Sequence, residues 1–283
     1  MLLIADSGST KCDWVLFENK DATPIKIRTK GLNPSVLKKE TLQNIISENK
    51  QLLNYKDKVS SIHFYGAGCN TNNTIQLIST IFSSYFKNAK IDVKEDTMAA
   101  VKASTNAAAV VCILGTGSNC CFFDGNQIYQ KVPAMGYLLM DEASGNYFGK
   151  ELLKCYYYNQ MPETLKVLFE EKFVISENEV ISKLYQSDAP NKYLAEFAVF
   201  LFENKHDSVM KNIINKGIKK FVDNQILQFE EELKFVPLYF VGSIAYYAQD
   251  FINEALKERG LRAARFIKRP IENLIYKIKE ETF

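Results

Sequence analysis

The sequence predicts an α/β protein built from two similar halves. Apolar strands and helical segments alternate along the first third of the chain, which is typical of this class. A shift of 109 residues places segment 4–9 on segment 113–118, and each is an apolar strand end followed by a glycine and a serine. A repeated strand and loop indicates an internal duplication.

The first half reads as strands with helices between them. Val36, Leu37, Leu42 and Ile45 recur at helical spacing, and alternating or continuous apolar runs mark the strands. The expected elements are strands over residues 2–5, 12–18, 61–65 and 90–94 and helices over residues 34–49 and 74–86.

The second half starts with a continuous apolar strand, repeats the loop and hairpin, and then becomes mainly helical. A turn is expected at residues 124–126, where aspartate, glycine and asparagine follow one another. The other expected elements are strands over 110–114, 236–241 and 264–268, helical segments over 147–233 and 245–259, and a closing helix after Pro270.

The length of 283 residues favours two domains, because single hydrophobic cores stop growing beyond about 250 residues. We expect an N-terminal domain over 1–108 and a C-terminal domain over 109–269 that carries a helical insertion. The closing helix, 270–283, can pack back on the first domain.

Composition excludes several partners. The 35 basic and 33 acidic residues give a net charge of +2 without a long basic run, so we expect no nucleic acid and no anionic membrane as partner. The longest apolar run, 107–114, is well short of the roughly 20 residues that span a bilayer, and 1–5 is too short for a signal sequence. These features predict a cytoplasmic protein.

Six scattered cysteines without a C-x-x-C pair, beside two histidines, argue against a zinc site and for buried, reduced thiols.

The opening loop Asp6-Ser7-Gly8-Ser9-Thr10-Lys11 has two interpretations. Small residues let backbone N–H groups approach an anion, and an aspartate at a strand end can hold Mg²⁺ through water. An ordinary hairpin turn also explains the glycine, and for either loop alone it is the slightly better interpretation. The common G-x-x-x-x-G-K-[ST] phosphate loop is absent from the sequence.

Six segments in order carry a resemblance: DSGSTK, YGAG, KEDTMAA, LGTGSNC, MDEASG and YFVGSIA. Together they resemble the actin, Hsp70 and sugar-kinase superfamily, and more closely the N-acetylglucosamine kinase branch of the BadF/BadG/BcrA/BcrD-type ATPase family. The matches extend from Ile4 to about Tyr276. The resemblance implies two ribonuclease H-like (actin-like ATPase) domains with a nucleotide and sugar cleft between them.

The resemblance also implies site residues. Asp6 would hold Mg²⁺, and the ATP contacts would come from a first phosphate loop, a second phosphate loop and an adenosine motif. The first loop implies Ser7, Gly8, Ser9, Thr10 and Lys11 as ATP-binding residues, and the second implies Gly115, Thr116, Gly117 and Ser118. The adenosine motif adds Gly242 and Ser243. Ser243 stands where the family usually has a second glycine.

Asp96 aligns with the catalytic base of the family, which takes the proton from the attacking hydroxyl. From the residues alone, Asp96 is better explained as the cap of a helix starting at Thr97, and the two roles are compatible. The sugar contacts implied are Asn33, Gly68, Asp96, Asn119, Asp141 and Glu142. Asn33 is equally well explained as a turn residue before Pro34, and Met140 and Ala143 replace usual glycines.

The function implied is an ATP-dependent kinase acting on the 6-hydroxyl of N-acetylglucosamine or a related amino sugar, with ATP and Mg²⁺ as cofactors. The alternative is the other branch of the family, an ATP-hydrolysing activator of a dehydratase or reductase that shares an iron–sulfur cluster between subunits. A non-catalytic sugar or nucleotide sensor is a third. The oligomeric state stays open, with a homodimer among the alternatives.

Overall fold

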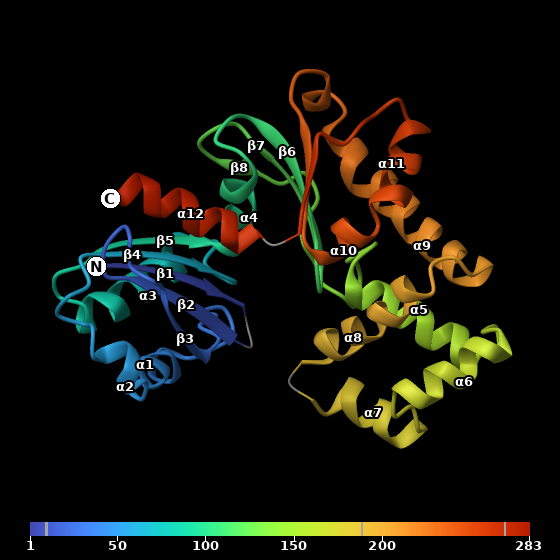
Figure 1. Ribbon diagram of the computed structural model, residues 1–283, viewed down its shortest axis with the longest axis horizontal. Coiled ribbons are helices and arrows are strands. Elements are labelled where there is room, and N and C mark those ends of the chain that lie inside the picture. The colour runs from blue at the N-terminus through green and yellow to red at the C-terminus, as the bar shows by residue number, and fades with distance from the viewer. Residues whose placement is uncertain (9–10, 188, 269) are drawn as a thin grey trace. The chain divides into compact units, whose positions relative to one another are not determined.

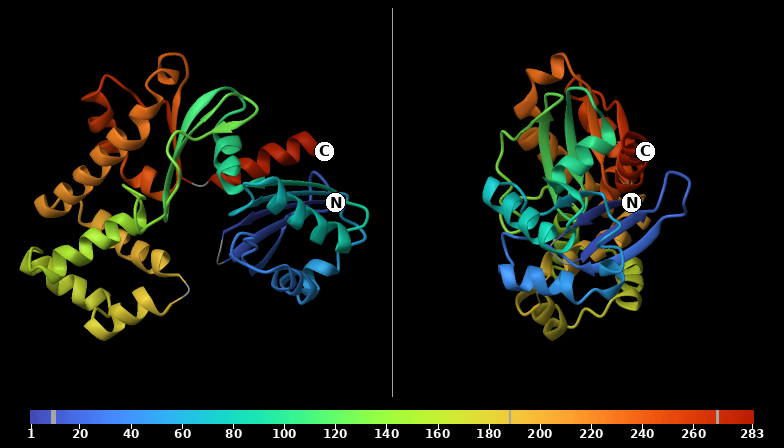
Figure 2. Two further views of the ribbon diagram at one scale, coloured as in Figure 1. Left: turned by 180° about the vertical axis from the view of Figure 1, so that it is seen from behind. Right: turned by 90° about the vertical axis from the view of Figure 1, so that its left-hand side faces the viewer.

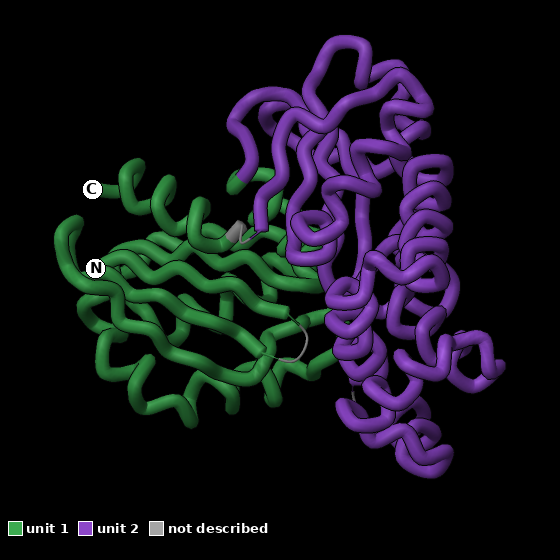
Figure 3. The backbone as a smooth tube through the Cα atoms, turned by 45° about the vertical axis from the view of Figure 1, so that its right-hand side comes forward, with its two compact units in different colours: residues 1–103, 270–283 green, residues 104–269 purple. Residues whose placement is uncertain are grey.

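The computed structural model describes residues 1–8, 11–187, 189–268 and 270–283. Ser9 and Thr10, two of the predicted ATP-binding residues, therefore lie outside the described residues. The chain divides into two compact units, residues 1–103 with 270–283 and residues 104–269 (Figure 3).

Unit 1 is a five-stranded sheet in the order β3-β2-β1-β4-β5 (Figure 1). β2 is antiparallel to both β1 and β3, whereas β1, β4 and β5 run parallel. The strands are β1 (Leu2–Ser7), β2 (Lys11–Phe17), β3 (Ile25–Lys30), β4 (Ser61–Gly66) and β5 (Lys90–Glu95). The helices are α1 (Lys39–Ser47), α2 (Lys50–Leu53), α3 (Asn72–Tyr85), α4 (Asp96–Ser104) and α12 (Pro270–Thr282).

Both faces of this sheet are covered, which explains why β1 reads as a continuous apolar run. α1, α2 and α3 lie over one face and α4 and α12 over the other, as the two sides of the molecule show (Figures 1 and 2). Trp14, Phe64 and Phe82 form an aromatic cluster in the core beneath α1 and α3. Leu2, Ile4 and the α12 residue Leu274 belong to the core on the opposite face.

Unit 2 has a second five-stranded sheet, in the order β10-β9-β6-β7-β8. β7 is antiparallel to β6 and β8, whereas β6, β9 and β10 run parallel, so both sheets contain three antiparallel strands followed by two parallel ones. The strands are β6 (Ala109–Leu114), β7 (Ser118–Phe123), β8 (Ile128–Tyr129), β9 (Leu238–Val241) and β10 (Arg265–Ile267). The predicted internal repeat is confirmed.

The helices of unit 2 come mainly from the segment between β8 and β9. α5 packs along α8, and α9 packs against α5 and α11, around a core rich in phenylalanine. The elements are α5 (Gly145–Tyr157), α6 (Glu163–Lys172), α7 (Glu177–Tyr185), α8 (Pro190–Glu203), α9 (Ser208–Phe221), η1 (Val222–Ile226), η2 (Leu227–Phe229), η3 (Glu232–Lys234), α10 (Ser243–Tyr247) and α11 (Gln249–Lys257).

One expected element differs in a way that bears on function. The helix predicted over 34–49 begins only at Lys39 in α1. The Asn33 side chain accepts a hydrogen bond from the Ser35 N–H, and the Asn33 carbonyl accepts from the N–H of Leu37, so residues 33–37 form a turn instead. In the part of the chain that the structure describes, no helix is both long and apolar enough to cross a bilayer.

Candidate active site

The predicted site residues of unit 1 gather at the carboxyl edge of its parallel strands. β1 ends at Ser7, β4 at Gly66 and β5 at Glu95, and their register places these ends next to one another. Open α/β sheets bind ligands at this edge. Asp6 and Asp96 both belong to it, one at the end of β1 and the other immediately after β5.

Asp6 is in an unfavourable position for a carboxylate. Burial and the negative charge of Asp96 raise the pKa of Asp6 to about 6, and Asp13 adds to the rise. A divalent cation would offset this repulsion, so the residues fit the Mg²⁺ implied by the resemblance. The described residues contain no group of three metal-ligating side chains.

Asp96 both starts a helix and carries a perturbed carboxylate. Asp96 is the first residue of α4, and its Oδ1 accepts a hydrogen bond from the N–H of the next residue, Thr97, at 2.9 Å. Burial raises the pKa of Asp96, while the N–H groups at the helix start oppose that rise. A carboxylate with a raised pKa accepts a proton more readily, which is the property required of a general base.

The opening loop connects β1 to β2 in a hairpin. The N–H of Gly8 donates to the Lys11 carbonyl at 3.0 Å. The hydroxyl of Ser7 is buried and accepts from the N–H of Leu32 at 2.8 Å, so Ser7 fixes the segment that leads to Asn33. The Lys11 ammonium is 2.8 Å from Asp13.

Asn33 and Gly68 lie side by side. A Cβ on Gly68 would come within 2.1 Å of the Asn33 Oδ1, and the hydroxyl of Ser35 donates to the Gly68 carbonyl. The Asn33 side chain is 7% exposed and is held by its own turn. The structure therefore brings two of the predicted sugar contacts together.

The second loop, residues 115–118, follows β6 and is hydrogen-bonded to the start of α5. The N–H groups of Gly145 and Asn146 donate to the carbonyls of Gly115 and Thr116, at 2.8 and 3.0 Å. The peptide bonds are trans, so an N–H points opposite to the carbonyl of the residue before it. The N–H groups of Thr116 and Gly117 therefore point away from α5, as donors to a phosphate would.

Asp141 is bound to this loop. Its Oδ1 accepts from the N–H of Ser118 at 3.2 Å and its Oδ2 accepts from the Asn146 side chain at 2.8 Å. Its neighbour Glu142 has a different environment, because its Oε2 is buried and has no hydrogen-bond partner among the described residues. A buried carboxylate oxygen without a partner is costly and suits a ligand with hydroxyl groups. Asn119 lies on β7, opposite Ile113.

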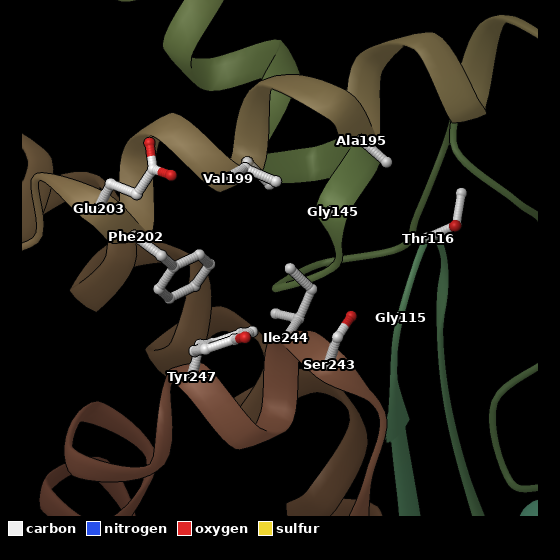
Figure 4. A pocket seen from close by; sticks show the side chains of 11 residues that line it. Gly115, Thr116, Gly145, Ala195, Val199, Phe202, Glu203, Ser243, Ile244 and Tyr247 are labelled. Atoms are coloured by element: carbon white, nitrogen blue, oxygen red, sulfur yellow. The ribbon is translucent and has the colours of Figure 1, made fainter. Parts of the chain in front are cut away.

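A cavity of about 380 Å³ opens beside the second loop and the adenosine motif. Residues of α8, among them Ala195 and Phe202, line one side, and Ile244 and Tyr247 of α10 line the other, with Ser243 and Thr116 at one end (Figure 4). A largely apolar cavity next to the outward-pointing N–H groups of the second loop has the properties of a site for the base and sugar of a nucleotide.

Gly242 makes this arrangement sterically possible. Its φ is +113°, and a Cβ there would lie 2.2 Å from the Leu114 carbonyl oxygen, so only glycine fits. Its N–H donates to the Ile267 carbonyl at 2.9 Å, which ties the adenosine motif to β10. The serine at position 243 follows without strain as the first residue of α10.

Sequence reasoning missed the cavity lining from α8, as well as Tyr247 and Asn146. Ala195, Ala198 and Val199 do recur at helical spacing, but small apolar residues in a helix are equally typical of a packed core.

Comparison with solved structures places the fold. The chain is similar over its whole length to a candidate N-acetylglucosamine kinase of Porphyromonas gingivalis, with 28% identity, full coverage of both chains and a TM-score of 0.88. It is also similar to a candidate N-acetylglucosamine kinase of Chromobacterium violaceum (13% identity, 97% of each chain, TM-score 0.58). A third is a ROK family glucokinase of Streptomyces griseus, solved with glucose and AMPPNP (12% identity, 99% and 98% coverage, TM-score 0.59).

No protein-family model matches the chain, and no curated protein matches it in sequence. The structural similarity confirms the resemblance to the N-acetylglucosamine kinase-like branch and the two-domain actin-like fold.

Proposed function

We propose that the protein is an ATP-dependent sugar kinase that phosphorylates the 6-hydroxyl of N-acetylglucosamine or a closely related amino sugar. The observation that carries the proposal is that two carboxylates with raised pKa, the half-buried Asp6 and the solvent-accessible Asp96, interact at the carboxyl edge of unit 1. The full-length similarity to the Porphyromonas gingivalis protein supports the choice of sugar.

In this proposal Asp96 accepts the proton of the attacking 6-hydroxyl. The hydroxyl oxygen forms a bond to the γ-phosphorus of ATP while the bond to the β,γ-bridging oxygen breaks, which gives a sugar phosphate and ADP. Bound Mg²⁺, held by Asp6, would neutralise developing charge on the phosphates.

The residues proposed to hold the sugar are Asn33, Gly68, Asp96, Asn119, Asp141 and Glu142. The carboxylate of Glu142 and the amide of Asn33 support this assignment most strongly. The Glu142 Oε2 is buried without a partner among the described residues, Asn33 is held by its own turn, and hydroxyl groups are suitable partners for both.

The residues proposed to hold ATP are the two loops, 7–11 and 115–118, with Gly242 and Ser243. The N–H groups of Thr116 and Gly117 would bind phosphate, and the cavity beside Tyr247 would take the nucleoside.

The experiment is an ADP-release assay with Mg²⁺, ATP and a panel of sugars, run on the protein and on Asp96→Asn. The proposal expects release with an N-acetylated amino sugar well above that with glucose, and loss of the signal in the variant. Release that no sugar stimulates would contradict the proposal. Iron bound to the purified protein, together with sugar-independent ATP hydrolysis, would instead favour the activator alternative.

A further inference from the structure

We propose that Asn146 is a positioning residue that holds the second loop in its phosphate-binding shape by clamping Asp141. The inference rests on the proposed function only in taking ATP as the ligand of this loop. The geometry that points to it is a closed set of hydrogen bonds between the loop, residues 141–144 and the start of α5.

The clamp begins inside unit 2 at Ser144, which is fully buried. The Ser144 hydroxyl accepts from the N–H of Tyr147 at 3.2 Å as the N-cap of α5, so it donates its own proton to the Asn146 Oδ1, 2.9 Å away. This donation fixes the orientation of the amide. The Asn146 NH₂ group must then face the other way.

The amide donates to the Asp141 Oδ2 at 2.8 Å in a charge-assisted bond, which is partly buried because Asn146 is only 1% exposed. The remaining oxygen of Asp141 accepts from the N–H of Ser118 at 3.2 Å. Asn146 is thereby connected through one carboxylate to the residue that ends the loop.

Asp141 and the backbone of Asn146 both contact the second loop. The Asp141 Oδ2 would lie 3.0 Å from a Cβ at Gly117, so the carboxylate occupies the space beside that glycine. The backbone N–H of Asn146 holds the Thr116 carbonyl from the other side. Asn146 therefore contacts the loop through its backbone and, by way of Asp141, through its side chain.

The position of Asp141 has a conformational cost that the clamp offsets. Its φ is +70° and that of Ala143 is +58°, a backbone region that is unfavourable for residues other than glycine. Such a conformation persists only where surrounding contacts hold it. The two N–H donors to Asp141, from Ser118 and Asn146, supply those contacts and satisfy both of its carboxylate oxygens.

The test is a donor–acceptor swap. Asn146→Asp places two carboxylates against each other, whereas the double variant Asp141→Asn/Asn146→Asp restores all three bonds. In the double variant the new amide at position 141 donates to the new carboxylate at position 146, accepts from Ser118, and leaves one carboxylate oxygen for the Ser144 hydroxyl. Gln225→Ala removes another buried polar side chain of unit 2 as a control for general destabilisation.

The measurement is calorimetric titration of each folded protein with MgATP and with adenosine, which has no phosphate. We expect Asn146→Asp to bind ATP about tenfold more weakly, adenosine affinity to stay within about threefold, and the double variant to recover ATP affinity. Gln225→Ala should keep both affinities. Unchanged ATP affinity in Asn146→Asp, or equal loss for both ligands, would overturn the clamp.

If Asn146→Asp does not fold, the double variant decides, because it retains every donor and acceptor: a folded double variant without preference for ATP over adenosine overturns the proposal. A wild-type protein without that preference would overturn the proposed function as well. Failure of the clamp alone leaves the wild-type preference intact, so the two failures are distinguishable.

Discussion

The two sheets share one strand order, yet the loops after their first strands are built for different chemistry. Under the shift of 109 residues, Asp6 corresponds to Gly115 and Gly8 to Gly117. Unit 1 thus has a half-buried carboxylate where unit 2 has a glycine without a side chain. In unit 1 negative charges are brought together, and in unit 2 N–H groups are turned outward by the start of α5.

The two units therefore keep the same strand order although the residues of their loops differ. A repeated strand and glycine loop gives both halves an edge where ligands can bind. The side chains at that edge then specialise. Our account assigns metal binding and proton transfer to unit 1, and the main nucleotide contacts to unit 2.

The substitution with the largest expected effect tests the role of the unit 1 carboxylates. Asp96→Asn removes the proposed base while retaining a cap for α4, so turnover should fall at least about 100-fold with ATP binding within about threefold of wild type. Steady-state ADP release and calorimetry measure the two effects. The neighbouring Glu95→Gln is the control, and a greater loss there than in Asp96→Asn would transfer the role to Glu95.

The second prediction concerns the cost of the unit 1 carboxylates. Asp6→Asn should lower turnover at least about tenfold through lost Mg²⁺ binding and, at pH 8, raise the free energy of unfolding by about 1–3 kcal/mol. The gain arises because burial raises the pKa of Asp6 from 3.8 to about 6, so the ionised side chain destabilises the folded state.

Because the pKa of Asp6 is higher in the folded than in the unfolded state, the stability gain of Asp6→Asn depends on pH. Below pH 3.8 Asp6 is protonated in both states and the gain disappears; it grows as the pH rises to about 6 and is constant above. Urea unfolding at pH 4, 5, 6 and 8 measures it. A gain of equal size at pH 4 and pH 8 would show that the carboxylate charge is not its cause.

The third prediction compares the two loop glycines directly. A Cβ at Gly8 has its nearest neighbour, the Lys11 carbonyl oxygen, at 3.8 Å, whereas one at Gly117 would lie 3.0 Å from Asp141. Gly8→Ala should therefore leave stability unchanged and lower ATP affinity up to about tenfold by crowding the phosphates. Gly117→Ala should lower both stability and ATP affinity.

Thermal unfolding and ATP titration of the two alanine variants measure this contrast. Unchanged ATP affinity in Gly8→Ala would mean that the opening loop is only a hairpin turn, as its sequence alone also allowed.

The smallest expected effect concerns Ala143, which stands where the family resemblance implies a glycine. Ala143→Gly relieves a φ of +58°, worth about 1–2 kcal/mol. It also removes a fully buried methyl group, worth about 0.8 kcal/mol, and loosens the unfolded chain by about 0.5–1 kcal/mol. These effects nearly cancel, so we expect urea unfolding to shift by less than about 0.5 kcal/mol; a change above about 1 kcal/mol would contradict this accounting.

The sequence predicted the α/β class and the internal repeat because strand periodicity and glycine loops are local signals. It also placed Asp6 and Asp96 after apolar strands, from which a shared sheet edge follows. The contacts of Asp141 could not be predicted, since they depend on a left-handed backbone at residues that are not glycine. The cavity beside α8 was hidden as well, because that helix buries residues on several sides.

Ser7 shows the same limit at a single residue. Its place in a loop of hydroxyls suggested a phosphate contact. In the structure its hydroxyl is buried and accepts a hydrogen bond from the N–H of Leu32, 25 positions away in the chain. Only the packing of the segment after β3 determines this bond. A direct contact of the Ser7 side chain with ATP stays a prediction.

The most direct test of the account is whether ADP release requires the 6-hydroxyl of the sugar. ADP release is measured with MgATP and either N-acetylglucosamine or its 6-deoxy analogue, at matched concentrations. The account predicts stimulation by N-acetylglucosamine and none by the 6-deoxy sugar, which still competes as an inhibitor. Equal stimulation by both sugars, or by neither, would contradict transfer to the 6-hydroxyl.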